Sequence, residues 1–307
     1  MEYRVYKLAF SAGVHFGKNS LDNTQVSFCA DTLFSALCQE ALRVGKSYLQ
    51  SLLEYSKQGN LILSDAFPYQ GNELFLPKPM RYIESGKAED SSLKKAYKQL
   101  KYIPLTYFNK YLSGNFPIER ADEWKKFGTG GMKVSASVRG EKDTTPYRVA
   151  VYHFYENCGL YVIAGYTLEE AKDLFEELME LLSYSGIGGK RSSGLGRFEF
   201  RSAKIPAELE ERLKKNGTSY MTLSVSLPQA DELDDAIRDA SYLLEKRSGF
   251  VASETYASEH QRKRDLYVLA SGACVSCRFK GDVYDVSGYG NHPVYRYAKP
   301  IFLEVGI

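Results

Sequence analysis

The chain has 307 residues, of which 44% are apolar and 25% are charged. This balance excludes a disordered chain, and the length allows two hydrophobic cores of ordinary size. The 40 basic and 38 acidic side chains leave a net charge of +2, which excludes a protein that coats nucleic acid through its overall charge. A nucleic-acid site on this chain would therefore have to be local.

The first elements predicted along the chain are a strand and a helix. Residues 3–10 alternate between apolar and polar side chains, which is the period of a strand. Residues 31–44 place apolar side chains on one helical face. Asp31 is the candidate N-cap of this helix, and Gly45 is its predicted end.

A hairpin and two further strands are predicted next. Residues 61–69 and 74–79 are apolar runs joined by a turn at Gly71–Asn72. Residues 149–155 and 160–166 are two more predicted strands, on either side of a turn at 156–159.

A helix follows, with Thr167 and Glu170 at the spacing of a capping box. Its predicted buried stripe consists of Ala171, Leu174, Phe175, Leu178, Leu181 and Leu182. A glycine-rich loop at 186–196 leads into a strand at 197–205. The order strand, helix, two strands, helix, strand predicts a ferredoxin-like unit over the first part of the chain.

The second half repeats parts of this order. A short helix is predicted after Pro206, and a linker ends at Asn216–Gly217. Then come a strand at 220–227 and an apolar helical stripe from Leu233 to Leu244 that ends at Lys246–Arg247 and Gly249. Further strands are expected near 250–256, 266–278, 282–286 and 294–305. No clear second helix follows, so this half is predicted to be a degenerate copy.

Residues 81–148 fit neither half. A segment of this length between strands is far longer than an ordinary loop, and such segments are usually functional or mobile. Within it, residues 133–139 alternate and predict one arm of a protruding hairpin.

The stretch from Gly186 to Arg197 is the strongest functional signal. Its glycines allow positive φ and let backbone amides converge on an anion; they are Gly186, Gly188, Gly189, Gly194 and Gly196. Lys190, Arg191 and Arg197 add positive charge, and Ser192 and Ser193 can donate to phosphate oxygens. We therefore expect this loop to bind phosphates.

Two familiar nucleotide-binding loops are excluded by the residues present. A P-loop would need glycine where Tyr184 stands and Ser or Thr where Arg191 stands. A dinucleotide-binding loop that starts at Gly186 would also need glycine at position 191. Both motifs run from strand to helix, whereas this loop runs from helix to strand. A polyanionic backbone is therefore a better candidate ligand than one buried triphosphate.

Two other segments combine glycine, histidine and basic residues. His15, Phe16, Gly17 and Lys18 follow the first strand, where an RNA contact or a general-base role is conceivable. His292, Tyr295 and Arg296 follow a second glycine-containing loop and could bind a phosphate or stack on a base.

The cysteines predict free thiols in a reducing compartment, and hence a cytoplasmic protein. Their number is odd and no signal peptide is recognisable; they are Cys29, Cys38, Cys158, Cys274 and Cys277. Cys274 and Cys277 form a single CxxC without a second pair or a nearby His, so we expect strand residues there and no metal site. No apolar run approaches the ~18 residues of a membrane span, so no membrane partner is expected.

Several motifs together resemble a known family. They are His15–Gly17, Phe28–Leu37, Leu76–Pro79, Tyr184–Phe198, Ser248–Ser253, Tyr284–Val286 and His292–Pro300. In this combination the chain resembles the RAMP superfamily of CRISPR proteins, and within it the family of the fourth Csm subunit of type III-A effector complexes. The resemblance covers almost the whole chain, and its most specific part is 184–198.

This resemblance implies an α+β fold of two tandem ferredoxin-like (RRM-like) domains. The first would span residues 1–205, with a long thumb-like hairpin inserted at about 81–148. A linker at 206–217 would lead to the degenerate second domain at 218–307.

The resemblance also implies a function. The chain would be a non-catalytic subunit that binds the repeat-derived 5′ handle of crRNA in antiviral defence, without cofactor, metal or catalytic residue. Its partners would be the crRNA, the adjoining target RNA, the large polymerase-like Csm subunit and the neighbouring RAMP backbone subunit.

Individual residues receive roles by the same resemblance. Gly186 to Arg197 would hold handle phosphates, with His15 to Lys18 beside them. Arg139 would lie on the thumb near the junction of handle and guide, and His292 to Arg296 would line the RNA face of the second domain. Two alternatives stay open: a metal-independent RAMP endoribonuclease that processes CRISPR transcripts, using His15 near Lys190, and a pure scaffold that uses its acidic helices.

Overall fold

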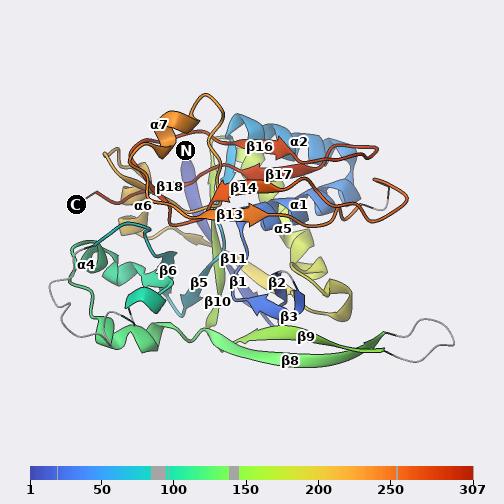
Figure 1. Cartoon of the computed structure of the whole chain (residues 1–307), viewed down its shortest axis with the longest axis horizontal. Helices are drawn as coiled ribbons and strands as arrows, with labels where there is room; N and C mark the ends of the chain where they lie inside the picture. The colour runs from blue at the N-terminus through green and yellow to red at the C-terminus, as the bar shows by residue number, and fades with distance from the viewer. Residues whose placement is uncertain (19, 84–94, 96, 138–144, 254, 307) are drawn as a thin grey trace.

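The computed structural model describes every residue except 19, 84–94, 96, 138–144, 254 and 307. One large sheet runs through the middle of the molecule, and the second half of the chain, orange to red, lies beside the helices of the first half (Figure 1). Within the described residues, no helix is long and apolar enough to cross a membrane.

The large sheet is antiparallel throughout. Its strands follow one another as β11 (Phe198–Lys204), β1 (Glu2–Phe10), β10 (Cys158–Tyr166), β5 (Phe67–Gln70), β6 (Glu73–Pro77) and β7 (Tyr102–Pro104), and β4 (Leu61–Leu63) also pairs with β10. β10 is buried along its whole length because both faces of the sheet are covered. These strands confirm the predictions for 3–10, for the hairpin at Gly71–Asn72, for 160–166 and for 197–205.

Three helices cover one face of this sheet: α1 (Ala30–Val44), α2 (Lys46–Gln58) and α5 (Glu169–Ser185). The helix predicted over 31–44 is confirmed, and Gly45 ends it by donating its amide to Ala41 O. The chain then resumes helical structure at once, so α2 is an element that the sequence analysis did not predict.

Both predicted N-caps are wrong. Cys29 precedes α1, and Asp31 lies inside its first turn with a buried carboxylate. α5 begins after Leu168, and the hydroxyl of Thr167 donates to Asn60 Oδ1 at 2.7 Å instead of capping the helix. In the buried stripe of α5, Met179 is buried whereas Leu181 is exposed.

Residues 102–127 build a second core on the other face of the sheet. η1 (Leu105–Tyr107), α4 (Phe108–Leu112) and η2 (Ile118–Trp124) pack their aromatic side chains there. Phe116 contacts Trp124 with 5.3 Å between the ring centroids. Much of the predicted 81–148 insertion is therefore compact structure and not one long loop.

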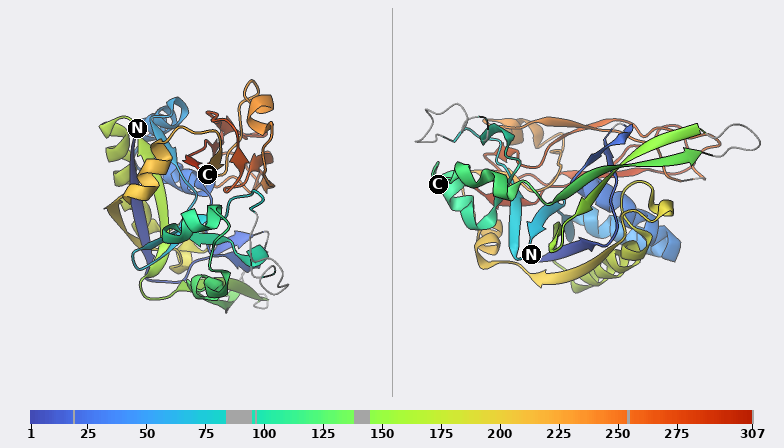
Figure 2. Two further views of the ribbon diagram at one scale, coloured as in Figure 1. Left: turned by 90° about the vertical axis from the view of Figure 1, so that its left-hand side faces the viewer. Right: turned by 90° about the horizontal axis from the view of Figure 1, so that it is seen from below.

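The protruding hairpin is confirmed for its described residues. β8 (Gly128–Ser137) and β9 (Thr145–Phe154) pair in one unbroken register. The described part of the hairpin lies along the lower edge of the molecule (Figure 1; Figure 2, left). Arg139, assigned to it from the resemblance, lies outside the described residues.

The second half forms several small antiparallel sheets. α6 (Ala207–Lys214) joins it to β11 and confirms the short helix expected after Pro206. β12 (Tyr220–Thr222) lies between β15 (Cys274–Val275) and β18 (Phe302–Glu304). The segment after β12 reaches β14 (Leu266–Leu269) through a bridge from Ser226 to Leu269, and β14 pairs with β13 (Leu244–Arg247). The spatial order is therefore β13, then β14 with β15, then β12, then β18. β16 (Asp282–Asp285) and β17 (Tyr295–Ala298) form a separate hairpin beside α1 and α2.

Two predictions for this half are wrong. The helix expected from Leu233 to Leu244 ends at Ile237 as α7 (Leu233–Ile237). Leu244 instead begins β13, because the backbone there pairs with Leu269. Its side chain is exposed. The described residues 250–253 and 255–256 form no strand beyond a bridge from Phe250 to Arg262.

A buried carboxylate joins the two halves. Asp65 Oδ1 accepts from the amide of Ala30 at 2.8 Å and from the amide of Val225 at 3.0 Å. Its own amide donates to Leu223 O at 2.9 Å. The first turn of α1 is thereby fixed against the second half, and this contact shapes the cleft described next.

Candidate nucleic-acid interface

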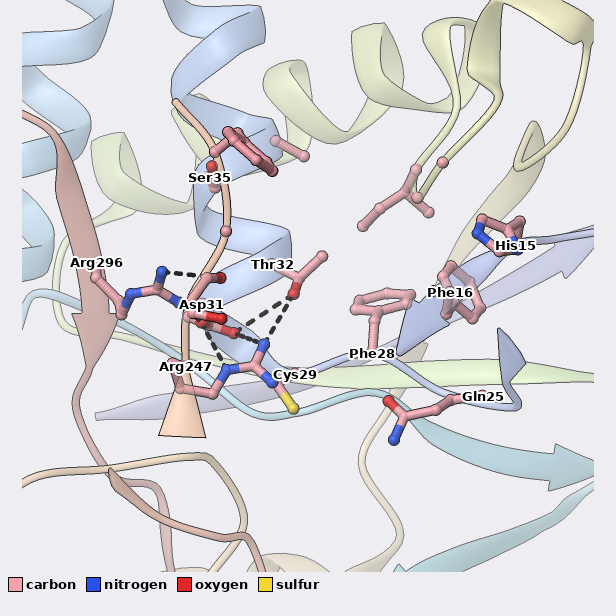
Figure 3. A pocket seen from close by; sticks show the side chains of 18 of the residues that line it. His15, Phe16, Gln25, Phe28, Cys29, Asp31, Thr32, Ser35, Arg247 and Arg296 are labelled. Atoms are coloured by element: carbon pink, nitrogen blue, oxygen red, sulfur yellow. Dashed lines mark hydrogen bonds and ion pairs between the residues drawn. The ribbon is translucent and has the colours of Figure 1, made fainter. Parts of the chain in front are cut away.

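One cleft of about 330 Å³ collects residues from both halves of the chain. The first turn of α1, the strand β2 (Phe16–Lys18), the glycine loop and residues 247–250 form its walls. In Figure 3 the two arginines lie at one end of the cleft and His15 and Phe16 at the other. The principal side chains are His15, Phe16, Gln25, Phe28, Asp31, Arg191, Arg247, Phe250, Lys263 and Arg296.

The glycine loop is fastened to the segment before β2. The amide of Gly189 donates to His15 O at 2.8 Å, and the amide of Gly196 donates to Gly13 O at 3.0 Å. A Cβ on Gly188 would lie 2.7 Å from His15 O, and one on Gly196 would lie 2.1 Å from Ile187 O. These glycines are therefore required by close backbone packing, and the amides of Gly189 and Gly196 are used within the protein.

The side chains of the loop point in different directions. Arg191 donates to Gln39 Oε1 at 2.8 Å and lines the cleft. Lys190 turns to the hairpin, where its ammonium donates to the Tyr147 hydroxyl at 3.1 Å and lowers the pKa of that hydroxyl. Ser192, Ser193 and Arg197 are exposed, and only Gly188, Gly189 and Arg191 of the predicted loop residues line the cleft.

His15 is a structural part of the cleft wall. Its side chain is buried, and Nδ1 donates to Ala150 O at 2.8 Å. The ring lies so close to Gly17 and Gly189 that a Cβ on either would approach it within 2.8 Å. The predicted neighbourhood of His15 to Gly17 and the glycine loop is thus present, and the backbone of Lys18 continues it in β2.

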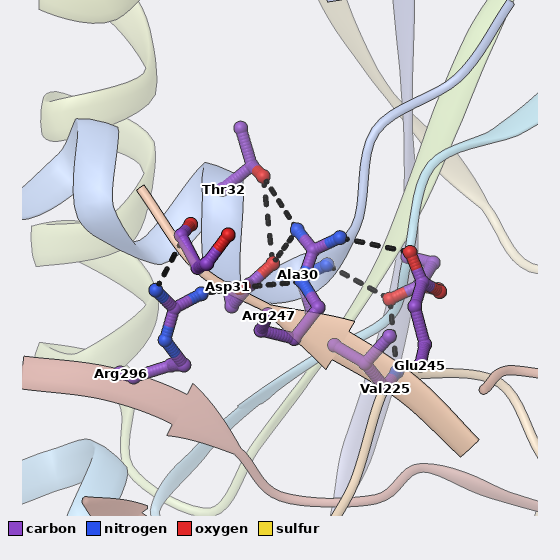
Figure 4. Close-up of polar contacts among 9 residues, drawn as sticks. Ala30, Asp31, Thr32, Val225, Glu245, Arg247 and Arg296 are labelled. Carbon is purple, nitrogen blue, oxygen red and sulfur yellow. Dashed lines mark hydrogen bonds and ion pairs between the residues drawn. The ribbon is translucent and has the colours of Figure 1, made fainter. Parts of the chain in front are cut away.

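The opposite end of the cleft holds an ionic cluster that the sequence analysis missed. The Asp31 carboxylate accepts from Arg247 Nε at 2.9 Å, from Arg247 Nη2 at 2.6 Å and from Arg296 Nη1 at 2.6 Å. Arg247 also pairs with Glu245 Oε1 at 3.0 Å (Figure 4). Burial alone would raise the pKa of Asp31, but the two guanidinium groups outweigh it and lower that pKa.

The cleft has an excess of positive charge. Four cations line it, Arg191, Arg247, Lys263 and Arg296, and Asp31 is the one carboxylate of the lining. Outside the lining, Glu245 pairs with Arg247 and Glu40 lies 4.0 Å from Arg191. Burial and the nearby Arg296 lower the pKa of Lys263. Arg296 Nε is buried and has no hydrogen-bond partner in the described part of the chain. Such a concentration of cations in a narrow space favours an anionic ligand.

The three RNA-binding residues predicted in the second half do not lie together in the structure. Arg296 lines the cleft, as part of the ionic cluster. His292 does not line it: Nε2 lies 2.8 Å from Ser253 Oγ, and the ring packs on Tyr256. Tyr295 lies under the ammonium of Lys57 and also outside the cleft lining.

Sequence reasoning missed Asp31, Arg247 and Lys263 because no spacing connects them. Arg247 is 216 residues and Arg296 is 265 residues from Asp31 along the chain. Arg247 had the appearance of a basic residue at a helix end, and Asp31 that of an N-cap. Two of the family motifs gave a signal: Phe28–Leu37 contains Asp31, and Ser248–Ser253 contributes Ser248, Gly249 and Phe250 to the cleft.

Known proteins match this chain over both of its halves. Residues 7–199 match the RAMP superfamily, and residues 215–305 match the CRISPR Csm4 C-terminal domain. The CRISPR system Cms protein Csm4 of Mycobacterium tuberculosis (strain CDC 1551 / Oshkosh) is 39% identical over 307 residues, which cover 99% of this chain and 98% of that protein.

Two solved structures share the fold at 20% sequence identity. A chain of the Csm3–Csm4 subcomplex in the type III-A CRISPR–Cas interference complex matches with a TM-score of 0.68, over 98% of each chain. A chain of the Csm1–Csm4 cassette in complex with AMPPNP matches with a TM-score of 0.65, over 100% of this chain and 99% of that one. The 39% identity to the Mycobacterium tuberculosis protein extends over both halves of the chain. It is well above the 20% identity of the two solved structures, which shows a shared fold alone. The chain therefore belongs to the Csm4 family of the RAMP superfamily.

Proposed function

We propose that this chain is the crRNA-binding, non-catalytic subunit of a type III-A CRISPR–Cas interference complex, acting in the cytoplasm in antiviral defence. Its cleft would hold the sugar-phosphate backbone of the repeat-derived 5′ handle. The observation that carries this proposal is the set of four cations against one carboxylate in a cleft closed by the glycine loop. Phosphates of single-stranded RNA are the matching anions.

The ionic cluster suits phosphate binding because its arginines are held in place. Asp31 accepts from both Arg247 and Arg296, which fixes the two guanidinium planes before any ligand arrives. Arg247 uses Nε and Nη2 on Asp31 and Nη1 on Glu245, so this side chain contributes fixed positive charge to the cleft.

The strand orders support two ferredoxin-like units. In the first half the four main strands lie as β11, β1, β10 and then β4 with β5, and in the second half as β18, β12, β15 with β14, and then β13. Each is the order fourth, first, third, second of a β-α-β-β-α-β unit. In the second unit the hairpin β16–β17 stands where the second helix would be. We therefore keep domain limits of 1–205 and 218–307, with α6 inside the connecting 206–217 segment.

The hairpin β8–β9 is the proposed thumb of the first domain. Lys190 of the glycine loop contacts Tyr147 of β9, with 4.4 Å between the ammonium and the ring centroid. RNA held in the cleft would therefore continue toward the hairpin. This path supports the expected contacts with the handle–guide junction and the adjoining target RNA.

The solved relatives support two protein partners. The matching chains come from assemblies named for Csm3 with Csm4 and for Csm1 with Csm4. We propose that this chain likewise binds a RAMP backbone subunit and the large polymerase-like subunit.

The state of His15 supports a non-catalytic role. A general base must reach the proton that it removes. His15 is buried, its Nδ1 donates to a carbonyl, and its ring is enclosed by two glycine backbones. We expect no cleavage of repeat RNA by the purified chain, with or without EDTA.

A double variant tests RNA binding by the cleft. Arg191→Gln with Lys263→Gln removes two cleft cations but leaves the Asp31 cluster intact. We expect at least 10-fold weaker binding of a handle RNA oligonucleotide by the full chain at 0.15 M salt. The slope of log K against log salt should also fall by about 0.7 for each phosphate that the variant no longer neutralises.

The matched control is Arg201→Gln on β11, whose side chain is 84% exposed and outside the cleft. This variant should bind the handle RNA as the parent does. Equal affinity and equal salt slope in the double variant and the parent would contradict the proposal.

A further inference from the structure

An exposed aromatic ring stands at the rim of the cationic cleft. Phe250 lines the cleft and is 57% exposed, whereas Phe16 and Phe28 of the same cleft are buried. Single exposed apolar residues are common on protein surfaces. The position of Phe250 is different because its backbone is fixed and because cations stand beside it.

The ring sits on a short ribbon of two hydrogen-bonded segments. Phe250 and Arg262 face each other across an antiparallel bridge, and the amide of Val251 donates to Gln261 O at 2.9 Å. The guanidinium carbon of Arg262 lies 5.3 Å from the centroid of the Phe250 ring. This contact orders the ring, since a guanidinium is attracted to an aromatic face.

The same ribbon carries two of the cleft cations. Arg247 precedes Phe250 by three residues, which limits the separation of their Cα atoms to roughly 11 Å. The amide of Lys263 donates to Gly249 O at 2.9 Å, directly beside Phe250. A phosphate-binding group and an exposed π face are thus combined on one backbone.

We infer that Phe250 is a stacking platform for a base of the RNA whose phosphates occupy the cleft, an inference that rests on the proposed function. A nucleotide carries a charged phosphate and a flat base on one sugar, which matches cations and a ring on one ribbon. Proteins that hold single-stranded RNA combine a basic groove with aromatic side chains in this way. A docked apolar peptide would cover the ring but bring no anion to Lys263, whose amide is bonded to Gly249 O.

The test is a set of Phe250 variants in the full chain, measured with the handle RNA oligonucleotide. Phe250→Ala should weaken binding roughly 10-fold, a size typical of one stacked base. Phe250→Trp should restore the affinity, while Phe250→Leu should not, because leucine keeps apolar bulk but has no π face. Stacking adds no ionic contact, so the salt slope should stay that of the parent in all three.

Abasic RNA identifies the stacked base. Replacing one handle nucleotide at a time by an abasic site should reveal one position at which Phe250→Ala has no further effect. Tyr267→Ala is the control, since Tyr267 is 55% exposed on β14 but does not line the cleft. It should leave binding unchanged.

The outcomes separate this inference from the proposed function. If Phe250→Ala binds normally while the Arg191 and Lys263 double variant binds weakly, the stacking role is overturned and the RNA cleft stands. An equal loss for Phe250→Ala with every abasic RNA, or rescue by Phe250→Leu, would assign the ring to packing and overturn stacking. A Phe250→Ala chain that binds RNA normally but fails to join its protein partners would make the ring a protein contact and also overturn it.

Discussion

At the scale of single residues, the glycine loop shows that glycines can serve two purposes: some allow positive φ in open space, and others also allow close backbone packing. Gly188, Gly194 and Gly196 have positive φ, which the sequence analysis interpreted as freedom to collect amides around an anion. Gly188 and Gly196 are in addition pressed against backbone atoms, while Gly194 has nothing within 4 Å of a would-be Cβ. Sequence reasoning recognised the glycines, but only the packing shows which of them fasten the loop.

This difference predicts unequal effects of alanine at two glycines. Gly194→Ala and Gly196→Ala both place a side chain at positive φ, which costs about 1–2 kcal/mol. Gly196→Ala adds a Cβ 2.1 Å from Ile187 O, so its free energy of unfolding should drop by at least a further ~1–2 kcal/mol. Urea unfolding of both variants measures this, and equal losses would contradict the packing role of Gly196.

At the scale of elements, α1, α5, β1, β10 and β11 were predictable because each has a continuous apolar pattern. α2, which follows α1 at once, was not predicted. The prediction of a helix from Leu233 to Leu244 was wrong because the apolar spacing there also fits a short helix followed by a strand. What decides is the pairing of Leu244 with Leu269, a partner that lies far along the chain. The cluster of Asp31, Arg247 and Arg296 was missed for the same reason, because its members lie far apart along the chain, in α1, β13 and β17.

Asp31 holds these three elements together, which predicts a large effect of its neutralisation. Asp31→Asn removes the carboxylate that pairs with the buried Arg296 and the partly buried Arg247, so the free energy of unfolding at pH 7 should fall by about 3–5 kcal/mol. Asp122→Asn is the control, because Asp122 is 89% exposed in a surface pair with Lys125. Its change should stay within about 0.5 kcal/mol. Comparable small changes in both variants would mean that the cluster does not join the elements.

At the scale of the whole molecule, half of the cleft could be predicted. The glycine loop, His15 and Arg296 were named from local sequence, and the structure brings residues of all three groups to one cleft. Arg247, Lys263 and Phe250 could not be predicted, because their place depends on how the second half packs on α1. That packing depends on Asp65, whose carboxylate joins Ala30 to Val225.

The buried carboxyl group of Asp65 should make the stability of the contact between the two halves depend on pH. Burial raises its pKa to about 6, although the amides of Ala30 and Val225 oppose the rise. Between about pH 4 and 6 the folded chain keeps a proton that the unfolded chain has lost. This contribution to stability is therefore complete below pH 4 and is lost as the pH rises through 6, by at most ~1.4 kcal/mol per pH unit.

Asp65→Asn isolates that contribution, since an amide oxygen can still accept from Ala30 and Val225 but does not titrate. The free energy of unfolding of Asp65→Asn minus that of the parent should increase from pH 4 to 6 and stay level above pH 6.5. Asp31, with its lowered pKa, acts in the opposite direction: its contribution is present above pH 4 and is lost in acid. It is common to both chains and cancels in the difference. A difference that stays constant from pH 4 to 6.5 would show that Asp65 is ionised throughout, and the two halves would then be joined by a buried charge.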